Sequence, residues 1–420
     1  MTRLSLLGSV FCATTAATAA TVATAALGAC ATDNGNPVYG PQFGPTPERP
    51  DAAIDGSVDP IPEGGPGPTD GSPEADAPSS TCTSGTVVVV AGSDTALTGT
   101  AQLAGGAWTG AAIAGGAAKS RPAIVPYGPG FLALTRGPAD KLMSVSFGAA
   151  SWGAATAVGA ETTIGAPALA VVGAKAHGVY LTGGAPSFFF RVENPGTSWS
   201  AAQAVTSNGV QAFGQSAGSL SAAGADLVFA QDGGDNDGLY TQRYDGSWSV
   251  GTPVVDAGTL TTAPPTLAAL DGGKFDTVLV YADNTVNNVI GFTTRDATTK
   301  RWATATVTNP QAQTREQPSL ARISPTALVA AFRGNDQRPY TMRGTIGALA
   351  VTWSPPVALL ADTSTVDGPP AIAKGVCGDE AIAVFASGGQ VKATRLRGTS
   401  WTVPEAVSGA AGTRVSVSTR

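Results

Sequence analysis

Histidine is almost absent from this sequence, since His177 is the only one in 420 residues, and only 13% of the residues are charged. A single histidine, with no serine elbow or paired acid beside it, excludes a serine–histidine–acid triad. The few charges include no basic patch, so the sequence predicts no nucleic-acid partner. Gly, Ala, Thr, Ser and Val predominate instead, which favours an all-β protein with many tight turns.

Negative charge gathers in one segment, between Ala31 and Thr81. This segment holds nine acids against Arg49 alone, a net charge of −8, and it is also rich in proline. Such a composition does not bury enough apolar surface to offset the entropy of ordering the chain. We therefore expect residues 30–81 to form a disordered, extended tether that leads to a folded domain at 82–420.

The N-terminus has the pattern of an export signal. A short basic start is followed by the uncharged stretch Leu4–Ala26, which closes on Leu27-Gly28-Ala29-Cys30. This ending resembles the bacterial lipobox, and the resemblance implies cleavage after residue 29 and attachment of a diacylglyceryl group to Cys30. The alternatives are an ordinary signal peptide or a transmembrane helix. A lipobox would place the protein on the bacterial envelope, at the outer membrane, with the lipid anchor as its contact with the membrane.

Seven tryptophans divide the rest of the chain into repeats of similar length. Consecutive tryptophans, from Trp108 to Trp401, are 44, 47, 49, 54, 51 and 48 residues apart. Each unit after the first contains a strand led by Pro or Gly, a continuous apolar run such as Val278-Leu279-Val280-Tyr281, an alternating strand and the tryptophan. Short, evenly spaced strands with one aromatic per repeat are typical of a propeller. The sequence predicts an all-β, seven-bladed β-propeller of four-stranded blades.

The first unit lacks its inner strand, because Thr86–Val90 is already the second strand of its blade. The chain ends with a surplus strand, Arg414-Val415-Ser416-Val417-Ser418, which we expect to complete blade one and close the ring. Cys82 and Cys377 then occupy equivalent positions in adjacent blades, each just before a second strand. This register predicts a disulfide that staples the closure, and two free buried thiols are the alternative.

Several tryptophans follow a turn that resembles the Asp-box of sialidase-like (BNR-type) propellers, most closely Asn194-Pro195-Gly196-Thr197-Ser198-Trp199. In that family the box is structural. A sialidase-like enzyme also needs an arginine cluster, an acid/base aspartate and a tyrosine–glutamate pair. Arg121-Pro122 resembles the family's first-blade arginine motif, and Arg243, Arg322 and Arg343 are scattered arginines to which the sequence assigns no such role. Fucose-lectin propellers repeat an arginine, a glutamate and an aromatic in every blade, and here glutamate does not recur in register.

The turns between second and third strands lie on one face of a propeller, and their polar residues are concentrated in one sector. We predict a candidate ligand face there, formed by Asp232, Asp235, Asp237, Asp283, Asn284, Arg333, Asn335, Asp336 and Arg338. The 232–237 turn resembles a calcium loop but lacks the full acidic spacing, so a solvated turn is favoured. The sequence predicts no metal site, no catalytic residue and no cofactor.

We therefore expect a monomeric, non-catalytic lipoprotein whose propeller binds a glycan or protein ligand as a binding or scaffold module. The alternatives are a sialidase-like glycoside hydrolase and a structural envelope protein without a small ligand. The residues at the axis distinguish them, because a hydrolase needs carboxylates and arginines that converge there.

Overall fold

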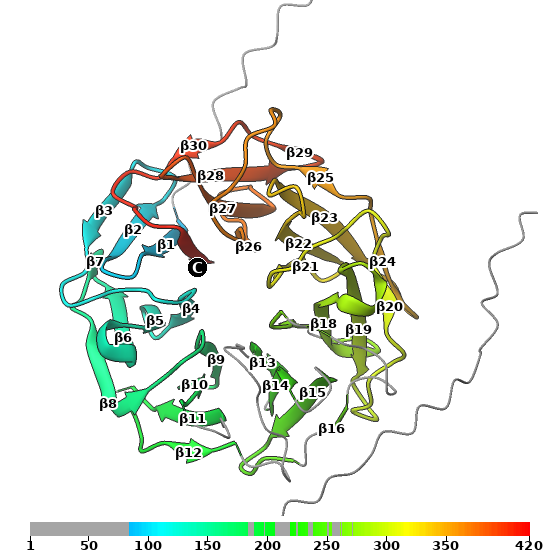
Figure 1. The fold of residues 1–420 in the computed structure, drawn as a ribbon, viewed down its shortest axis with the longest axis horizontal. Coiled ribbons are helices and arrows are strands. Elements are labelled where there is room, and N and C mark those ends of the chain that lie inside the picture. Colours follow the sequence, from blue (N-terminus) through cyan, green and yellow to red (C-terminus); the bar gives the residue numbers. More distant parts are fainter. Residues whose placement is uncertain are drawn as a thin grey trace, which may run out of the picture. The chain divides into compact units, whose positions relative to one another are not determined.

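The computed structural model describes residues 84–183, 189–196, 198–205, 219–223, 226–233, 238–249, 252–253, 261, 263–270 and 272–420. All of them belong to one compact unit, Glu74–Arg420. Seven antiparallel sheets of these residues stand as blades around a central axis (Figure 1). Among the described residues, no helix has the length and apolar character needed to cross a membrane.

Each blade runs from an inner strand at the axis to an outer strand at the rim. Blade one contains β31 (Arg414–Thr419), β1 (Thr86–Gly92), β2 (Leu97–Leu103) and β3 (Trp108–Ala112). Blade two contains β4 (Ala123–Tyr127), β5 (Gly130–Arg136), β6 (Lys141–Gly148), β7 (Ser151–Trp152) and β8 (Thr156–Thr162). Blade three contains β9 (Ala168–Val172), β10 (Lys175–Leu181), β11 (Phe189–Asn194) and β12 (Gln203–Ala204).

The remaining blades follow in chain order. Blade four contains β13 (Ser219–Ala223), β14 (Asp226–Gly233), β15 (Gly238–Tyr244) and β16 (Thr252–Pro253). Blade five contains β17 (Thr266–Ala269), β18 (Phe275–Asp283), β19 (Val289–Asp296) and β20 (Thr306–Val307). Blade six contains β21 (Ser319–Ser324), β22 (Ala327–Arg333), β23 (Pro339–Ile346), β24 (Val351–Trp353) and β25 (Val357–Ala358). Blade seven contains β26 (Ala371–Lys374), β27 (Ala381–Ser387), β28 (Gln390–Arg397), β29 (Ser400–Trp401) and β30 (Glu405–Ala406). Two 3-10 turns join second to third strands, η1 (Pro138–Asp140) in blade two and η2 (Asn284–Val286) in blade five.

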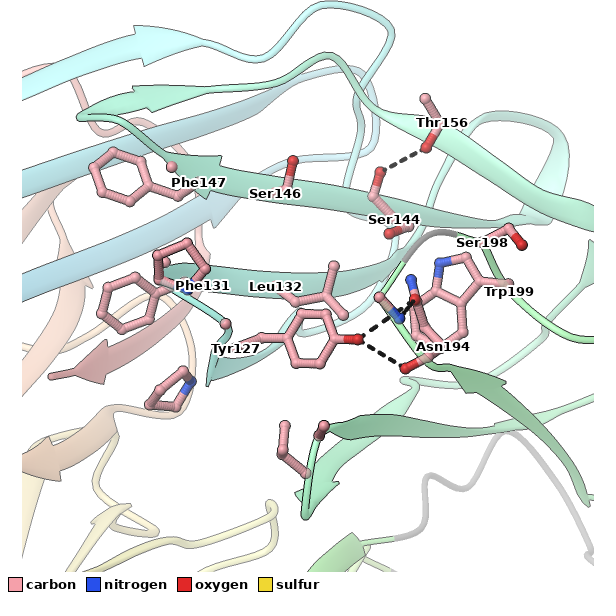
Figure 2. Close-up of a pocket in the computed structure, with 18 of the residues that line it drawn as sticks. Tyr127, Phe131, Leu132, Ser144, Ser146, Phe147, Thr156, Asn194, Ser198 and Trp199 are labelled. Carbon is pink, nitrogen blue, oxygen red and sulfur yellow. Dashed lines mark hydrogen bonds between the residues drawn. The ribbon is translucent and has the colours of Figure 1, made fainter.

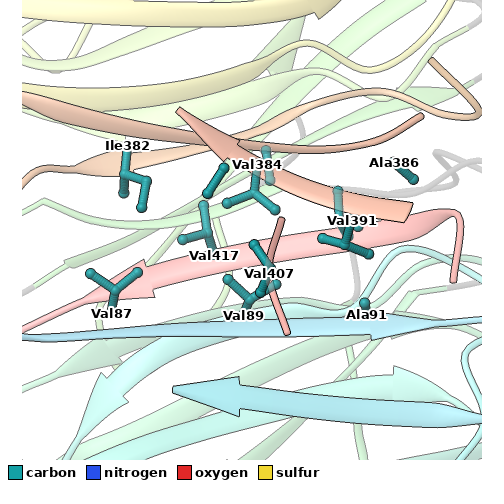
Figure 3. Close-up of a cluster of buried hydrophobic side chains, with 12 residues drawn as sticks. Val87, Val89, Ala91, Ile382, Val384, Ala386, Val391, Val407 and Val417 are labelled. Carbon is teal, nitrogen blue, oxygen red and sulfur yellow. The ribbon is translucent and has the colours of Figure 1, made fainter. Parts of the chain in front are cut away.

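The ring closes as the sequence predicts. Strand β31 pairs with β1 in antiparallel register, from Val87 opposite Thr419 to Gly92 opposite Arg414. The side chain of Val417 packs with valines of blades one and seven in a single apolar cluster (Figure 3). Because β31 occupies the inner edge of blade one, that edge is no longer open to pairing with another chain.

Hydroxyl groups on the inner strands join neighbouring blades near the axis. The Ser219 hydroxyl of blade four accepts from the backbone N–H of Leu267 in blade five, at 3.0 Å. The Ser416 hydroxyl of blade one donates to the carbonyl of Pro122 in blade two, at 2.5 Å. Such bonds satisfy polar groups that the narrow axial region removes from water, and they hold adjacent blades in register.

The tryptophans pack between blades, and this packing interrupts the fourth strands. We expected each fourth strand to open on its tryptophan, which holds for Trp108 in β3. In blades two, six and seven the tryptophan instead ends a short strand, and a second short strand follows it. The ring of Trp152 lies against blade one, where a Cβ at Gly99 would come within 2.3 Å of it. The chain bends there because the indole turns inward.

The start of the described chain lies beside Cys377. The Sγ atom of Cys377 is 3.4 Å from the carbonyl oxygen of Ser84. Cys82 lies outside the described residues, so the disulfide stays a prediction, and this short distance supports it. Cys30 and the tether also lie outside the described residues.

Candidate functional site

The two faces of the ring carry different turns. Because strands alternate in direction, the turns that join first to second strands and third to fourth strands lie on one face, which we call the pocket face. The turns that join second to third strands lie on the opposite face with the connections between blades. Pockets between neighbouring blades open among the turns of the pocket face.

A large pocket of about 1210 Å³ lies between blades two and three. Tyr127 at the end of β4 and Trp199 after β11 contribute aromatic side chains to it, and both are partly exposed. Figure 2 shows Tyr127, Asn194 and Trp199 at one end of the pocket and Phe131 and Phe147 at the other. Phe131 and Phe147 are buried, so the accessible aromatic surface of the pocket comes from Tyr127 and Trp199.

The polar lining of this pocket consists of hydroxyl, amide and guanidinium groups. The Tyr127 hydroxyl donates to the carbonyl of Asn194, at 2.8 Å, which ties blade two to blade three at the mouth. The exposed hydroxyl of Ser146 faces the same space, and the Arg420 guanidinium, which donates to the Gly128 carbonyl, contributes the cation of this lining. Among the described lining residues there is no Asp or Glu, so this pocket presents hydrogen-bonding groups and aromatic surface without an acidic side chain.

A second pocket, of about 200 Å³, lies on the axis and is lined by inner strands and the segments that lead into them from all seven blades. Its described lining includes Arg121 and Gln317 but no carboxylate. Arg121 donates to the carbonyl oxygens of Pro370 and Val415, at 2.9 and 3.3 Å. Burial lowers the pKa of Arg121 to about 10, partly offset by Glu316, so it stays charged. The described lining of the axis does not contain the convergent acids that a sialidase-like hydrolase needs.

A row of arginines lies on the third strands of five blades. The row comprises Arg191, Arg243, Arg295, Arg343 and Arg395, at intervals of 52, 52, 48 and 52 residues. Each forms an ion pair, with Glu193 (3.0 Å), Asp226 (2.7 Å), Asp276 (2.8 Å), Glu380 (3.1 Å) and Asp379 (3.1 Å) respectively. This row was not predicted from the sequence, although the even spacing of the arginines is itself a repeat signal.

The acids that pair with these arginines come from different places. Asp226, Asp276 and Asp379 lie at the start of the second strand of the same blade, whereas Glu380 belongs to the blade after that of Arg343. Glutamate therefore does not recur in register, as the sequence indicates, but an arginine–carboxylate pair does recur. At 2% exposure Arg295 is buried, so its pair with Asp276 is shielded from solvent.

His177 belongs to one of these ion-pair clusters. The Arg191 guanidinium donates to Nδ1 of His177 (2.9 Å), to Glu193 (3.0 Å) and to the Tyr244 hydroxyl of blade four (2.8 Å). Burial, followed by the charge of Arg191, lowers the pKa of His177 to about 4. His177 is thus neutral at pH 7, with its proton on Nε2, and it supports the packing of blade three against blade four.

The predicted ligand face lies on the opposite side of the ring from the pocket face, and its residues bond partly within their own turns and partly with neighbouring segments. Asp283 caps η2 through the N–H of Thr285, Arg333 pairs with Glu316, and Arg338 donates to the carbonyls of Leu360 and Asp362. Asp336 accepts from the Tyr340 hydroxyl, and Asn335 donates to Gln313. Among the described residues, no hydrogen bond or ion pair joins the Asp283–Asn284 turn to the Arg333–Arg338 turn. The shared ligand face stays a prediction.

The 232–237 turn, which resembles a calcium loop, lies mostly outside the described residues. Asp235 and Asp237 lie outside the described residues, and Asp232 is described only as part of strand β14. In the part of the chain that the structure does describe, no group of three or more His, Cys, Asp or Glu side chains is placed to hold a metal ion.

The sequence matches no protein-family model and no curated protein. The fold is similar to that of AofleA from Arthrobotrys oligospora, at 11% identity and a TM-score of 0.50, over 73% of this chain and 90% of that one. A six-bladed lectin of Aleuria aurantia with a described fucose recognition mode aligns at 12% identity over 62% and 87%, with a TM-score of 0.45. The SapL1 lectin in complex with alpha methyl fucoside aligns at 12% identity over 71% and 98%, with a TM-score of 0.48. At these identities the likeness concerns the propeller fold.

Proposed function

We propose that this propeller is a carbohydrate-binding module and that the pocket between blades two and three is its principal site. The observation that carries the proposal is the composition of this pocket, which has partly exposed Tyr127 and Trp199, several hydroxyls and no Asp or Glu side chain in its described lining, within about 1210 Å³. A sugar ring has an apolar face that packs on an aromatic side chain and a rim of hydroxyls that exchange hydrogen bonds with hydroxyl and amide groups. Aromatic walls with a few placed polar groups are the usual composition of a small-molecule site.

Repetition around the ring favours binding to a polysaccharide over binding to a single small sugar. Smaller pockets of about 390 Å³ and 210 Å³ lie between blades five and six and between blades six and seven, lined by Trp302 and Trp401 respectively. All three inter-blade pockets lie on the pocket face. A polymer that reaches two of them binds the second as an intramolecular event, which raises avidity without any new contact.

The lipid anchor forms the second part of the proposal. The motif at Leu27–Cys30 and the acidic, proline-rich segment after it support an exported protein held on the bacterial envelope by an acyl group on Cys30. A propeller held in this way presents its pockets to glycans of the cell surface or the surroundings. The hydrolase alternative gains no support from the axial pocket, whose described lining holds one arginine and no acid.

A glycan array probed with the full chain, followed by calorimetry on the strongest ligand, tests the binding function. We expect Trp199→Ala to remove an aromatic wall and Ala157→Trp to fill part of the pocket, and each to weaken binding at least tenfold. Ala157 and Ala160 are both exposed on β8, but only Ala157 lines the pocket. Ala160→Trp is therefore the matched control and should bind as the parent does.

Two results would overturn the proposal. One is an array on which the folded, full chain binds no glycan. The other is a ligand whose affinity is the same for the parent, Trp199→Ala and Ala157→Trp, because such a ligand binds elsewhere. A thermal melt of each variant separates loss of the pocket from loss of the fold.

A further inference from the structure

The pocket between blades five and six differs from the principal pocket in its charge. It is lined by β18, β19, the turn after β19 and the Leu349–Val351 segment of blade six. Two exposed cations, Lys274 and Arg301, border its volume of about 390 Å³. Both come from turns of the pocket face, Lys274 from the turn before β18 and Arg301 from the turn after β19.

These two cations have no carboxylate partner within ion-pair distance among the described residues. Asp276, the buried acid of blade five, already pairs with Arg295 (2.8 Å) and Lys300 (2.8 Å). Asp271 lies outside the described residues. The described part of blade five holds four cations, Lys274, Arg295, Lys300 and Arg301, and three carboxylates, Asp276, Asp283 and Asp296, a net charge of +1. Asp283 ends β18 on the face opposite the pocket, so only Asp276 and Asp296 lie at the pocket end of this blade.

Asp296 is the one carboxylate in the described lining of the pocket, and the local backbone holds it. It accepts from the N–H groups of Thr298 (2.9 Å) and Thr299 (2.7 Å) and from the Thr299 hydroxyl (3.1 Å). These bonds keep the pKa of Asp296 below its usual range, so it is ionised and turned toward its own loop. It lowers the positive potential of the pocket without forming an ion pair with Lys274 or Arg301.

The remaining walls add hydroxyls and an apolar edge. The Trp302 indole N–H donates to the Thr241 hydroxyl of blade four at 2.8 Å, and the ring packs on the apolar cluster of blades four and five, so it is turned toward blade four. Exposed Thr304 and Thr306 add hydroxyls to the pocket, and Leu349, with 77% of its surface exposed, adds an apolar edge from blade six. Hydroxyls, an apolar edge and two cations without an ion-pair partner among the described residues therefore meet in one space.

We propose that this pocket binds an anionic saccharide, with Lys274 and Arg301 contacting a carboxylate or sulfate group and the hydroxyls of Thr304 and Thr306 contacting the sugar. This inference rests on the proposed carbohydrate-binding function and names a second ligand class for it. The two pockets then bind chemically different parts of a glycan. The pocket between blades two and three takes the uncharged parts of a glycan, and the pocket between blades five and six takes an acidic residue of the same or another chain.

The test compares matched acidic and neutral oligosaccharides on the full chain. The probes are a galacturonate trisaccharide, a sulfated galactose trisaccharide and the neutral galactose trisaccharide, together with an array that carries acidic and neutral pairs. The variant is Lys274→Gln with Arg301→Gln. The control is Lys141→Gln with Arg315→Gln, which removes the same charge from two exposed cations on the opposite face.

We expect the Lys274→Gln/Arg301→Gln variant to lose at least tenfold in affinity for acidic glycans and to keep its affinity for neutral ones. The control should bind both as the parent does. Raising salt from about 50 mM to about 500 mM should weaken binding of the parent to acidic glycans and leave neutral ones unchanged, because exposed charges are screened over roughly 10 Å or less. The uronate and sulfate arms show which anion the pocket takes.

The outcomes separate this inference from the proposal on which it rests. If the parent binds neutral glycans in a Trp199-dependent way and no acidic glycan distinguishes the variant from the parent, the acidic site is wrong and the carbohydrate-binding function stands. The same holds if the control loses as much acidic binding as the variant, because net charge alone then explains the effect. If no glycan binds at all, both are wrong.

Discussion

Removing the C-terminal strand should destabilise the whole ring, even though residues 412–420 have the length of a dispensable tail. In β31 the side chains of Val415 and Val417 are 1% and 8% exposed, in the cluster that joins blades one and seven (Figure 3). Burying one valine contributes roughly 1.5–3 kcal/mol, so the two together contribute about 3–6 kcal/mol. A typical domain has a total stability of about 5–15 kcal/mol. Deletion also removes the β1–β31 hydrogen bonds and exposes the inner edge of blade one.

Urea and thermal unfolding of the full chain and of the 412–420 deletion measure this effect. We expect the deletion to lose most of the cooperative transition or to aggregate. Val415→Ala is a milder form and should cost roughly 2 kcal/mol, since two buried methyl groups are lost. Val403→Ala is the matched control, because Val403 is 89% exposed and its truncation should cost less than about 0.5 kcal/mol. A deletion variant as stable as the parent would refute the ring closure and the seven-blade count.

Three further predictions concern the contact between blades one and seven, the histidine and the lipid anchor. Reducing the expected Cys82–Cys377 disulfide should lower the melting temperature. The decrease should be smaller in the 412–420 deletion, because the reduction and the deletion both weaken the contact between blades one and seven. The pKa of His177 falls from an ordinary value near 6.5 to about 4 in the fold, so the unfolded chain binds more protons between these values and stability should fall as pH drops from about 6.5 to about 4. By linkage this loss is at most roughly 3 kcal/mol, and urea unfolding of His177→Gln across that range should show a flatter dependence. Labelled palmitate should be incorporated into the protein and not into Cys30→Ser, and incorporation that persists in that variant contradicts the lipid anchor.

The blade count and the closure could be predicted because each depends on a repeated apolar signal. Seven tryptophans at similar intervals and seven apolar second strands encode the repeat, and the surplus strand at Arg414–Ser418 matches the strand missing from blade one. These patterns determine burial, and burial determines the fold. The divided fourth strands were not predicted, because the inward turn of an indole such as Trp152 depends on a glycine in the neighbouring blade.

The pockets could not be predicted from the sequence because they form between blades. Tyr127 and Asn194 are 67 residues apart, and nothing in either local sequence indicates that the Tyr127 hydroxyl bonds the Asn194 carbonyl. The prediction of a ligand face relied on polar turns, yet the structure shows that Asp283 caps its own turn and that Arg338 donates to the carbonyl of Asp362, in the segment that leads to blade seven. Part of the polarity of these turns therefore serves hydrogen bonds within the protein. That Lys274 and Arg301 have no ion-pair partner among the described residues likewise becomes visible only when the partners of Asp276 and Asp296 are known.

The most direct test of the proposed function is a crystal structure of the propeller with the strongest glycan from the array. The proposal predicts density for a sugar ring between blades two and three, packed against Trp199 or Tyr127 and within hydrogen-bond distance of Asn194 or Ser146. Density for the glycan at the axis beside Arg121, or on the turns of the opposite face, with the pocket between blades two and three empty, would contradict it.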